Sequence, residues 1–114
     1  MNGCIFCRIA RGEIPCGKVY EDAEVLAFRD IHPQAASHLL LIPRRHLTGL
    51  NGLDEAEDAL LAALLRAVPL AAQAAGIAES GYRLVSNCGK DACQSVGHLH
   101  FHLLGGQPLS ERMV

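Results

Sequence analysis

Three histidines alternate with apolar residues near the end of the chain, in the segment His98-Leu99-His100-Phe101-His102. On a β-strand, residues two positions apart share a face, so this spacing predicts three imidazoles side by side and the intervening residues in the core. Burying three neighbouring imidazoles is costly unless they share a task. Imidazole is a nucleophile that also takes up a proton near neutral pH. Two chemistries therefore remain open: a three-histidine metal site, as in hydrolytic zinc enzymes, and covalent catalysis by one imidazole.

A pair of cysteines near the start of the chain, Cys4 and Cys7, is the second group able to do chemistry. Two thiolates about one helical turn apart suit a tetrahedral structural zinc, which needs two further ligands. The alternative is a thioredoxin-like redox pair, but that pair follows a strand, and Cys4 lies too near the chain start for one. The odd number of cysteines, five, favours a reducing compartment over a disulfide framework. Cys16, Cys88 and Cys93 receive no role.

The size and charge of the chain limit the classes of protein to which it can belong. Its 114 residues predict a single domain, 1–114, and a net charge of −2 gives no reason to expect a nucleic-acid partner. The first residues lack the basic region and apolar run of a signal peptide. The most apolar stretch, residues 59–75, is interrupted by Arg66, Pro69 and Gln73, too soon for a membrane span. We expect a cytoplasmic protein that does not enter a membrane.

Four elements are expected in the first half of the chain. Residues 5–11 predict a short helix that ends at Gly12. Residues 18–20 and 25–29 are typical of two strands, and the acidic segment between them indicates a hairpin turn. Residues 37–43 form a continuous apolar run of strand length, which predicts a strand buried on both faces.

The second half of the chain predicts one long helix and two strands. The helix covers residues 54–75, because Asp54 followed by Glu57 resembles a capping arrangement before an apolar stripe. Apolar residues extend around much of this helix, so one face could meet another subunit or pack only on the protein's own sheet. Residues 81–87 and 97–104 then indicate the last two strands, the second of which holds the three histidines.

The arrangement of these motifs resembles the histidine-triad (HIT) family, and within it the Hint-like branch of purine nucleoside phosphoramidases. The resemblance implies an α+β fold with a five-stranded antiparallel sheet, one long and one short helix, and a homodimer that joins two such sheets. Nearly the whole chain is covered, in order and with short gaps. The matching segments are Cys4-Ile5-Phe6-Cys7, Gly12-Glu13-Ile14-Pro15, Phe28-Arg29-Asp30-Ile31, Pro33-Gln34-Ala35, residues 38–43, Gly81-Tyr82-Arg83, Asn87, Gln94-Ser95-Val96 before the histidines, and Gly105-Gly106.

The resemblance implies a hydrolase in which His100 attacks the α-phosphorus of a purine nucleoside 5'-phosphoramidate or a related nucleotidyl compound, such as an adenylated amine or an aminoacyl adenylate. A nucleotidyl-histidine forms, and water then releases the nucleoside monophosphate. A bond from phosphorus to imidazole is labile enough for turnover, so one difficult displacement becomes two easier ones. A dinucleoside polyphosphate hydrolase of the Fhit-like branch is the enzymatic alternative. A nucleotide-sensing or scaffold protein with incidental hydrolysis is the third possibility.

The same resemblance implies roles for residues around the nucleotide. His38 would orient the triad through a hydrogen bond, and Asp30 would accept both ribose hydroxyls. His102 and Ser95 would contact the α-phosphate, and Ser95 would also assist the departing amine. The remaining nucleotide contacts fall into two sets: a phosphate cradle from Asn87 and the loop backbone at Cys93 and Gln94, and an apolar slot for the base from Ile5, Phe6, Ile9, Phe28 and Ile31.

Bacterial-type members of the family that carry the cysteine pair bind one structural zinc with two histidines, so the resemblance implies the ligand set Cys4, Cys7, His46 and His98. This assignment removes His98 from catalysis and implies no catalytic cofactor. The chain departs from the family at Cys93, where glycine is usual, and the altered residue could change the backbone of the phosphate cradle. Its tail, residues 107–114, also lacks the tryptophan-containing ending that is frequent in the family.

Overall fold

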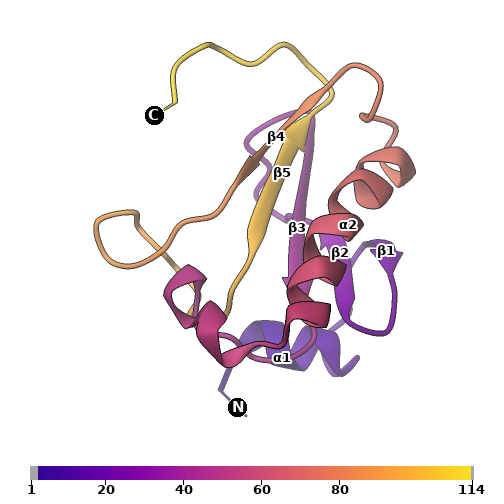
Figure 1. Ribbon diagram of the computed structural model, residues 1–114. Coiled ribbons are helices and arrows are strands. Elements are labelled where there is room, and N and C mark those ends of the chain that lie inside the picture. The colour runs from indigo at the N-terminus through magenta and orange to yellow at the C-terminus, as the bar shows by residue number, and fades with distance from the viewer. Residues whose placement is uncertain (1–2, 114) are drawn as a thin grey trace.

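The computed structural model describes residues 3–113, which form a five-stranded antiparallel sheet with helices on both of its faces (Figure 1). This architecture confirms the predicted α+β fold with one long and one short α-helix. The strand order is β1-β2-β3-β5-β4, so the last strand of the chain lies inside the sheet and β4 lies at its edge. In chain order the elements are α1 (Ile5–Ala10), β1 (Lys18–Glu21), β2 (Val25–Arg29), β3 (Ser37–Pro43), the 3-10 helix η1 (Leu50–Glu55), α2 (Asp58–Ala74), β4 (Tyr82–Val85) and β5 (Phe101–Gly105).

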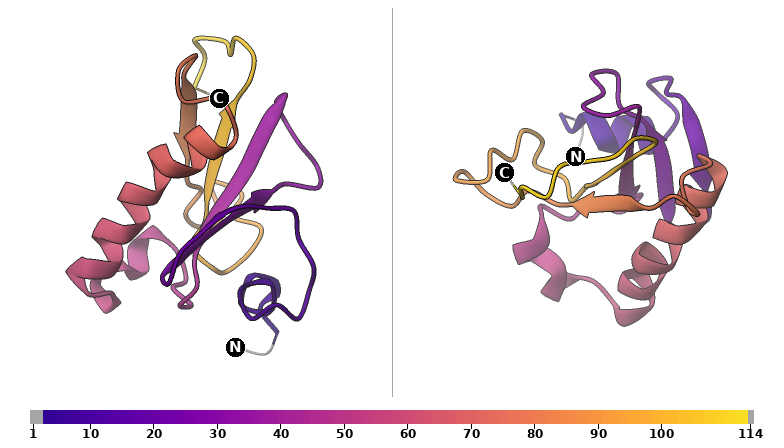
Figure 2. Two further views of the ribbon diagram at one scale, coloured as in Figure 1. Left: turned by 90° about the vertical axis from the view of Figure 1, so that its right-hand side faces the viewer. Right: turned by 90° about the horizontal axis from the view of Figure 1, so that it is seen from above.

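The two central apolar strands divide their side chains between two cores. Every residue of β3 is buried, as its apolar run predicts. Alternate side chains of β2 and β3 point to opposite faces: Ala27 and Leu41 pack in the cluster that α2 covers, whereas Phe28 and Leu40 pack in the cluster that contains α1. The left view of Figure 2 shows α2 on one side of the sheet and α1 on the other. The face that α1 covers is the one that carries the candidate site.

The long helix begins later than the sequence predicts. Residues Leu50–Glu55 form η1, and Ala56 and Glu57 are extended before α2 begins at Asp58. The predicted capping arrangement is therefore wrong: Asp54 lies inside η1, and Glu57 caps α2 without a side-chain hydrogen bond. The helix ends at Ala74, close to the predicted position. Among residues 3–113, no helix is both long and apolar enough to cross a membrane.

The two C-terminal strands are shorter than the sequence predicts. β4 covers Tyr82–Val85 and β5 covers Phe101–Gly105, so His98 and His100 precede the regular strand instead of lying on it. The register explains this boundary, because the last pair of β3 with β5 joins Leu41 to Phe101. Upstream of that pair, the Leu99 N–H donates to Leu47 O, 2.6 Å away, and the His98 ring contacts the end of β3.

Candidate functional site

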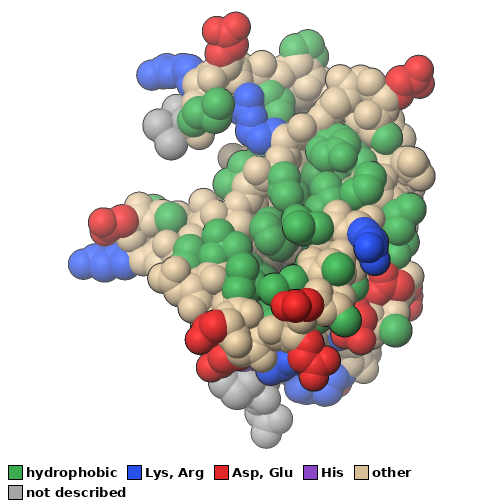
Figure 3. Space-filling view, in the orientation of Figure 1, with side chains coloured by type: hydrophobic (Ala, Val, Ile, Leu, Met, Phe, Trp, Pro, Cys, Tyr) green, Lys and Arg blue, Asp and Glu red, His purple; other side chains and the backbone are tan. Residues whose placement is uncertain are grey.

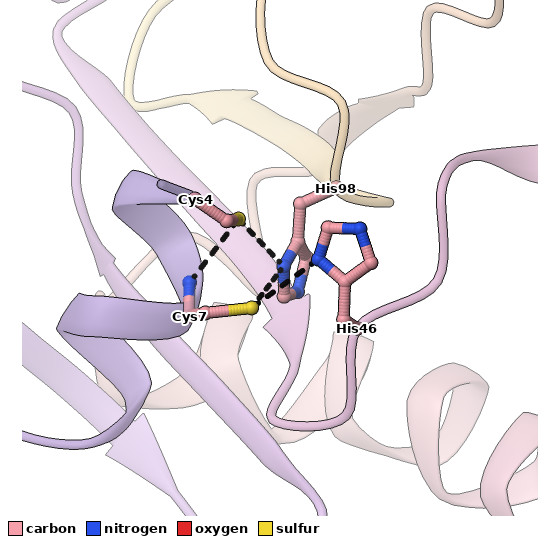
Figure 4. Close-up of side chains that lie close together, drawn as sticks. All are labelled: Cys4, Cys7, His46 and His98. Carbon is pink, nitrogen blue, oxygen red and sulfur yellow. Dashed lines mark hydrogen bonds between the residues drawn. The ribbon is translucent and has the colours of Figure 1, made fainter. Parts of the chain in front are cut away.

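Four side chains predicted to bind a metal converge beneath α1 (Figure 4). Their ligand atoms all lie within 4.8 Å of one another, although Cys4 and His98 are 94 positions apart in the chain. Cys4 Sγ lies 3.3 Å from His98 Nδ1, and Cys7 Sγ lies 3.2 Å from His46 Nδ1 and 3.5 Å from His98 Nδ1. Cys4 is also the N-cap of α1, and its Sγ accepts the Cys7 N–H at 3.4 Å. The start of α1 therefore delivers both sulfurs to the two imidazoles.

The chemistry and spacing of this cluster fit a tetrahedral metal. Zinc bonds of about 2.3 Å to sulfur and about 2.0 Å to nitrogen place ligand sulfur and nitrogen atoms about 3.5 Å apart in a tetrahedron. The three observed separations, 3.2 to 3.5 Å, lie close to that value. His98 Nε2 donates its hydrogen to Pro43 O at 2.8 Å, which leaves the lone pair of the neutral ring at Nδ1, facing the sulfurs. Burial lowers the pKa of His98 and so favours this neutral, ligating form.

Burial also affects the thiols of the cluster. The pKa of Cys7 is raised, first by burial and then by the neighbouring Cys4 sulfur. Two adjacent thiolates are unfavourable in such a place without a cation. A divalent metal at the centre would stabilise both thiolates, so the residues present fit the group that the sequence predicts.

His100 is held in the tautomer that an attacking imidazole needs. Its Nδ1 lies 2.7 Å from the backbone oxygen of His98. Because a carbonyl oxygen only accepts hydrogen bonds, Nδ1 carries the hydrogen and the lone pair of the neutral ring lies on Nε2. The residue is 3 % exposed, and its own carbonyl accepts a hydrogen bond from Ser86 Oγ at 2.8 Å. Hydrogen bonds with His98 and Ser86 thus fix both the ring and the backbone of His100.

A second chain of hydrogen bonds fixes the ring of His102. The Gln34 N–H donates to His38 Nδ1 at 2.9 Å, so the hydrogen of neutral His38 lies on Nε2. That atom is 2.9 Å from His102 Nδ1 and 3.4 Å from Asp30 Oδ2. His102 Nδ1 therefore accepts, and its Nε2 carries a hydrogen that can be donated to a ligand. Burial lowers the pKa values of both His38 and His102, which favours this neutral arrangement.

Asp30, His38 and His102 also lie close enough together to be considered as a metal site. The hydrogen bond from Gln34 argues against that role. It requires the hydrogen of neutral His38 to be on Nε2, the atom that would have to bind the metal. The geometry instead suits the orienting role that the family resemblance implies for His38.

An apolar pocket of about 180 Å³ opens beside these histidines, between α1 and the end of β2. Burial differs along it: Phe28 is buried, whereas Ile31 is 85 % exposed at the mouth. One carboxylate oxygen of Asp30 accepts the His32 N–H at 2.8 Å, which holds this side chain at the edge of the pocket. The structure brings together all the residues predicted for the base and the ribose, since the pocket is lined by Ile5, Phe6, Ile9, Phe28, Asp30 and Ile31, together with Ile14, Pro15, Cys16, Gly17, Arg29 and Leu40.

The loop between β4 and β5 distributes the other predicted residues over two hollows. Asn87 shares a hollow of about 210 Å³ with His38 and His102. Ser95 instead lines a hollow of about 470 Å³ with Cys4 and His46, on the side of the metal cluster. The structure therefore places Asn87, but not Ser95, beside the histidine that would hold the phosphate.

Hydrogen bonds within the same loop occupy the predicted phosphate donors. The Cys93 N–H donates to Lys90 O at 3.0 Å, and the Gln94 N–H donates to Gly89 O at 3.1 Å. Cys93 has a φ of 59°, in the left-handed region that favours glycine, which gives a physical reason for glycine at this family position. A cradle made from these two N–H groups would require the loop to rearrange.

Sequence reasoning missed the backbone partners that fix the rings. The Pro43 and His98 carbonyls and the Gln34 N–H each determine a tautomer, and Ser86 holds the His100 carbonyl. No residue-type signal identifies backbone partners. Gln34, Pro43 and His98 lie in segments that match the family, but the match gives no indication that their backbone groups hold these rings.

Comparisons with known proteins agree with this architecture. The model of the HIT domain family matches residues 11–109. The chain is 44 % identical over 105 residues to the purine nucleoside phosphoramidase of Escherichia coli, covering 92 % of this chain and 88 % of that protein. It is 48 % identical over 108 residues to a 14 kDa zinc-binding protein of Zea mays, covering 93 % and 84 %.

A solved structure extends the agreement to three dimensions. A HIT family hydrolase from Clostridium thermocellum superposes with a TM-score of 0.94 at 40 % identity, covering 100 % of this chain and 99 % of that one. Family model, relatives and structure thus agree over nearly the whole length. The chain belongs to the HIT domain family.

Proposed function

We propose that this protein hydrolyses purine nucleoside 5'-phosphoramidates or related nucleotidyl compounds at the α-phosphate, with His100 as the nucleophile. The observation that carries the proposal is the 2.7 Å contact between His100 Nδ1 and the His98 carbonyl, which leaves the lone pair on Nε2. The apolar pocket beside it, with Asp30 at its edge, supports a nucleoside as the group held. The name of the Escherichia coli relative, purine nucleoside phosphoramidase, supports the same reaction.

In the proposed reaction, His100 Nε2 forms a bond to the α-phosphorus while the bond from phosphorus to the leaving nitrogen breaks, and the nitrogen takes up a proton from solvent and departs as the amine. The Nε2–H of His102 donates to a phosphate oxygen as negative charge develops there. Water then attacks the same phosphorus and returns a proton to solvent, the bond to His100 breaks, and the nucleoside monophosphate leaves. His38 keeps His102 in the donating tautomer through their 2.9 Å contact.

We propose zinc as the metal held by Cys4, Cys7, His46 and His98. Two sulfurs and two imidazole nitrogens at near-tetrahedral spacing are typical of structural zinc. The name of the Zea mays relative, 14 kDa zinc-binding protein, supports this metal. When bound, zinc would tie the start of α1 to the segment before β5.

We propose that two copies associate through the edge strand β4 and the adjacent face of α2. β4 pairs only on one side, and its Tyr82 and Leu84 are each 37 % exposed. On α2, Leu65 is 63 % and Leu70 is 44 % exposed, so the predicted apolar stripe is incompletely covered within one chain. Figure 3 shows hydrophobic side chains gathered over the face that these elements share. Sedimentation analysis should give about twice the 12.2 kDa mass of one chain, and a single-chain mass would refute the association.

One comparison of substrates tests the proposed reaction. Adenosine phosphoramidate and a diadenosine polyphosphate are incubated with the protein, with His100→Ala and with His32→Ala, which removes an exposed imidazole but keeps the backbone N–H that Asp30 accepts. We expect adenosine monophosphate from the phosphoramidate with the parent protein and His32→Ala, and none with His100→Ala. Faster His100-dependent cleavage of the polyphosphate would favour the Fhit-like alternative. No His100-dependent turnover of either compound would refute the hydrolase.

A further inference from the structure

Helix α1 serves two sites at once. Cys4 and Cys7 at its start face the metal cluster, whereas Ile5, Phe6 and Ile9 line the apolar pocket. The helix has only six residues, and an isolated helix of that length has no stability of its own in water. Its position therefore depends on the contacts that its side chains make. Anything that anchors the two cysteines also anchors one wall of the pocket.

Phe6 connects the metal cluster, the pocket and the nucleophile directly. It is 6 % exposed, and its ring meets three other rings edge to face. The ring centroids lie 5.9 Å from His98, 5.1 Å from His100 and 5.8 Å from Phe28. Such aromatic contacts have preferred geometry as well as buried area, so a shift of one ring changes the contacts of the others. Phe6 thus joins a metal-binding imidazole to the candidate nucleophile and to a wall of the pocket.

His98 provides a second connection through its own backbone. Its ring lies in the metal cluster, while its carbonyl oxygen accepts the hydrogen bond from His100 Nδ1 at 2.7 Å. The same residue therefore ligates the metal and fixes the tautomer of the nucleophile. Because His98 precedes β5, its backbone lies outside the strand ladder, and the peptide unit that follows it is held by the Leu99 N–H bond to Leu47 O.

We infer that the metal site positions the nucleotide pocket and His100, and that Phe6 is the positioning residue linking them. The inference rests on the proposed function, since it makes nucleotide binding at that same site depend on the metal. Metal binding orders α1 and the His98 backbone, so the metal-loaded protein binds nucleotide more tightly than the metal-depleted protein. By linkage, nucleotide must then tighten metal binding by the same factor.

The metal cluster is also open to reagents. Cys4 and His46 line the hollow of about 470 Å³ that also contains Thr48 and Ser95. Cys4 is half-buried, in contrast to the fully buried His98. A chelator can therefore approach the cluster from this side without entering the nucleotide pocket, which shares one lining residue, Ile5, with this hollow.

Equilibrium binding of adenosine monophosphate tests the coupling without relying on turnover. Its Kd is measured by calorimetry for zinc-loaded, chelator-depleted and zinc-reloaded protein, at a temperature where circular dichroism shows the depleted protein folded. We expect about tenfold weaker binding after depletion, within the usual range for coupled sites, and recovery on reloading. Equal Kd values for folded loaded and depleted protein would overturn the inference. Absence of binding to the zinc-loaded protein would instead count against the proposed function.

A second test uses Phe6→Leu and does not require the metal-depleted protein to stay folded. The variant removes the aromatic ring but leaves all four metal ligands, and Arg8→Ala, an exposed change on the same helix, is its matched control. In the zinc-loaded state we expect one zinc per chain in both variants. Addition of adenosine monophosphate should tighten zinc binding, measured by chelator competition, about tenfold in the parent protein and Arg8→Ala but less than threefold in Phe6→Leu. The same factor in Phe6→Leu as in the parent protein would refute the linking role of Phe6.

Discussion

His98 and His100 are two positions apart and almost equally buried, yet their rings are fixed in opposite tautomers. His98 donates from Nε2 to the Pro43 carbonyl and presents Nδ1 to the cysteine sulfurs. His100 donates from Nδ1 to the His98 carbonyl and keeps its lone pair on Nε2. The difference indicates that the nearest backbone acceptor, and not the residue type or its burial, separates the candidate metal ligand from the proposed nucleophile.

The largest expected effect comes from removing each of the two rings in turn. His100→Ala should lower turnover of the phosphoramidate by at least about 10³-fold, because it removes the proposed nucleophile. It should retain one zinc per chain, since His100 is outside the cluster. His98→Ala should lose the zinc, because its imidazole is one of the four candidate ligands. Turnover and zinc analysis of both variants check this. Zinc loss in His100→Ala would contradict the division of roles between the two histidines.

Removal of the metal should be the next largest effect. Cys7→Ser replaces a buried ligand sulfur, so the variant should lose zinc and unfold at a temperature lower by on the order of 10 °C. Chelation of the parent protein should produce a similar shift, whereas Cys16→Ser, outside the cluster, should not. Differential scanning calorimetry with metal analysis measures both. An unchanged zinc content in Cys7→Ser would rule out the ligand set.

A smaller effect is expected from the ring that holds His102. His38→Phe keeps a planar aromatic ring but removes the Nε2–H that donates to His102 Nδ1, so His102 is no longer confined to the tautomer that donates from Nε2. We expect kcat to fall about tenfold with KM nearly unchanged, since the change alters orientation beside the phosphate and not the base pocket. Steady-state kinetics provide the readout. A rise in KM at constant kcat would show that His38 serves binding instead.

The pH dependence of stability should show the smallest effect. Burial lowers the pKa values of His38 and His102 below the usual 6.5, so both are neutral in the folded protein while the unfolded chain takes up protons below about that pH. Their contribution to stability is therefore complete above pH 6.5 and is lost as the pH falls towards the lowered values. The unfolding temperature should fall between pH 7 and pH 5, and less steeply in His38→Phe. Equal slopes in the two proteins would contradict this assignment.

The periodicity of the sequence was sufficient for the sheet but not for the ends of its elements. The apolar run of β3 and the short helix α1 occur where the residues predict them. The start of α2 was misplaced because the acidic residues near Asp54 suit either a cap or a 3-10 turn, and tertiary contacts selected the turn. The strand that holds the histidines begins later than the sequence predicts, since the alternation continues through His98 although the ring and backbone of His98 are engaged elsewhere.

In the candidate site, the side chains could be predicted from the sequence, but their backbone partners could not. The family resemblance identified the four residues of the metal cluster and the residues around the apolar pocket, which the structure brings together. It gave no indication of the Pro43 and His98 carbonyls, because every residue carries a carbonyl and only the fold decides which one lies beside a ring. The position of Ser95 and the occupied N–H groups of Cys93 and Gln94 likewise depend on loop geometry.

Nitrogen-15 spectroscopy of the histidine rings tests the opposed tautomers most directly. In zinc-loaded protein above pH 7, His100 should show a protonated Nδ1 and an unprotonated Nε2, whereas His98 should show a protonated Nε2 and a metal-bound Nδ1. Assignment by His98→Ala and His100→Ala distinguishes the two rings. A protonated Nε2 on neutral His100 would place no lone pair at the attacking atom and would contradict the account.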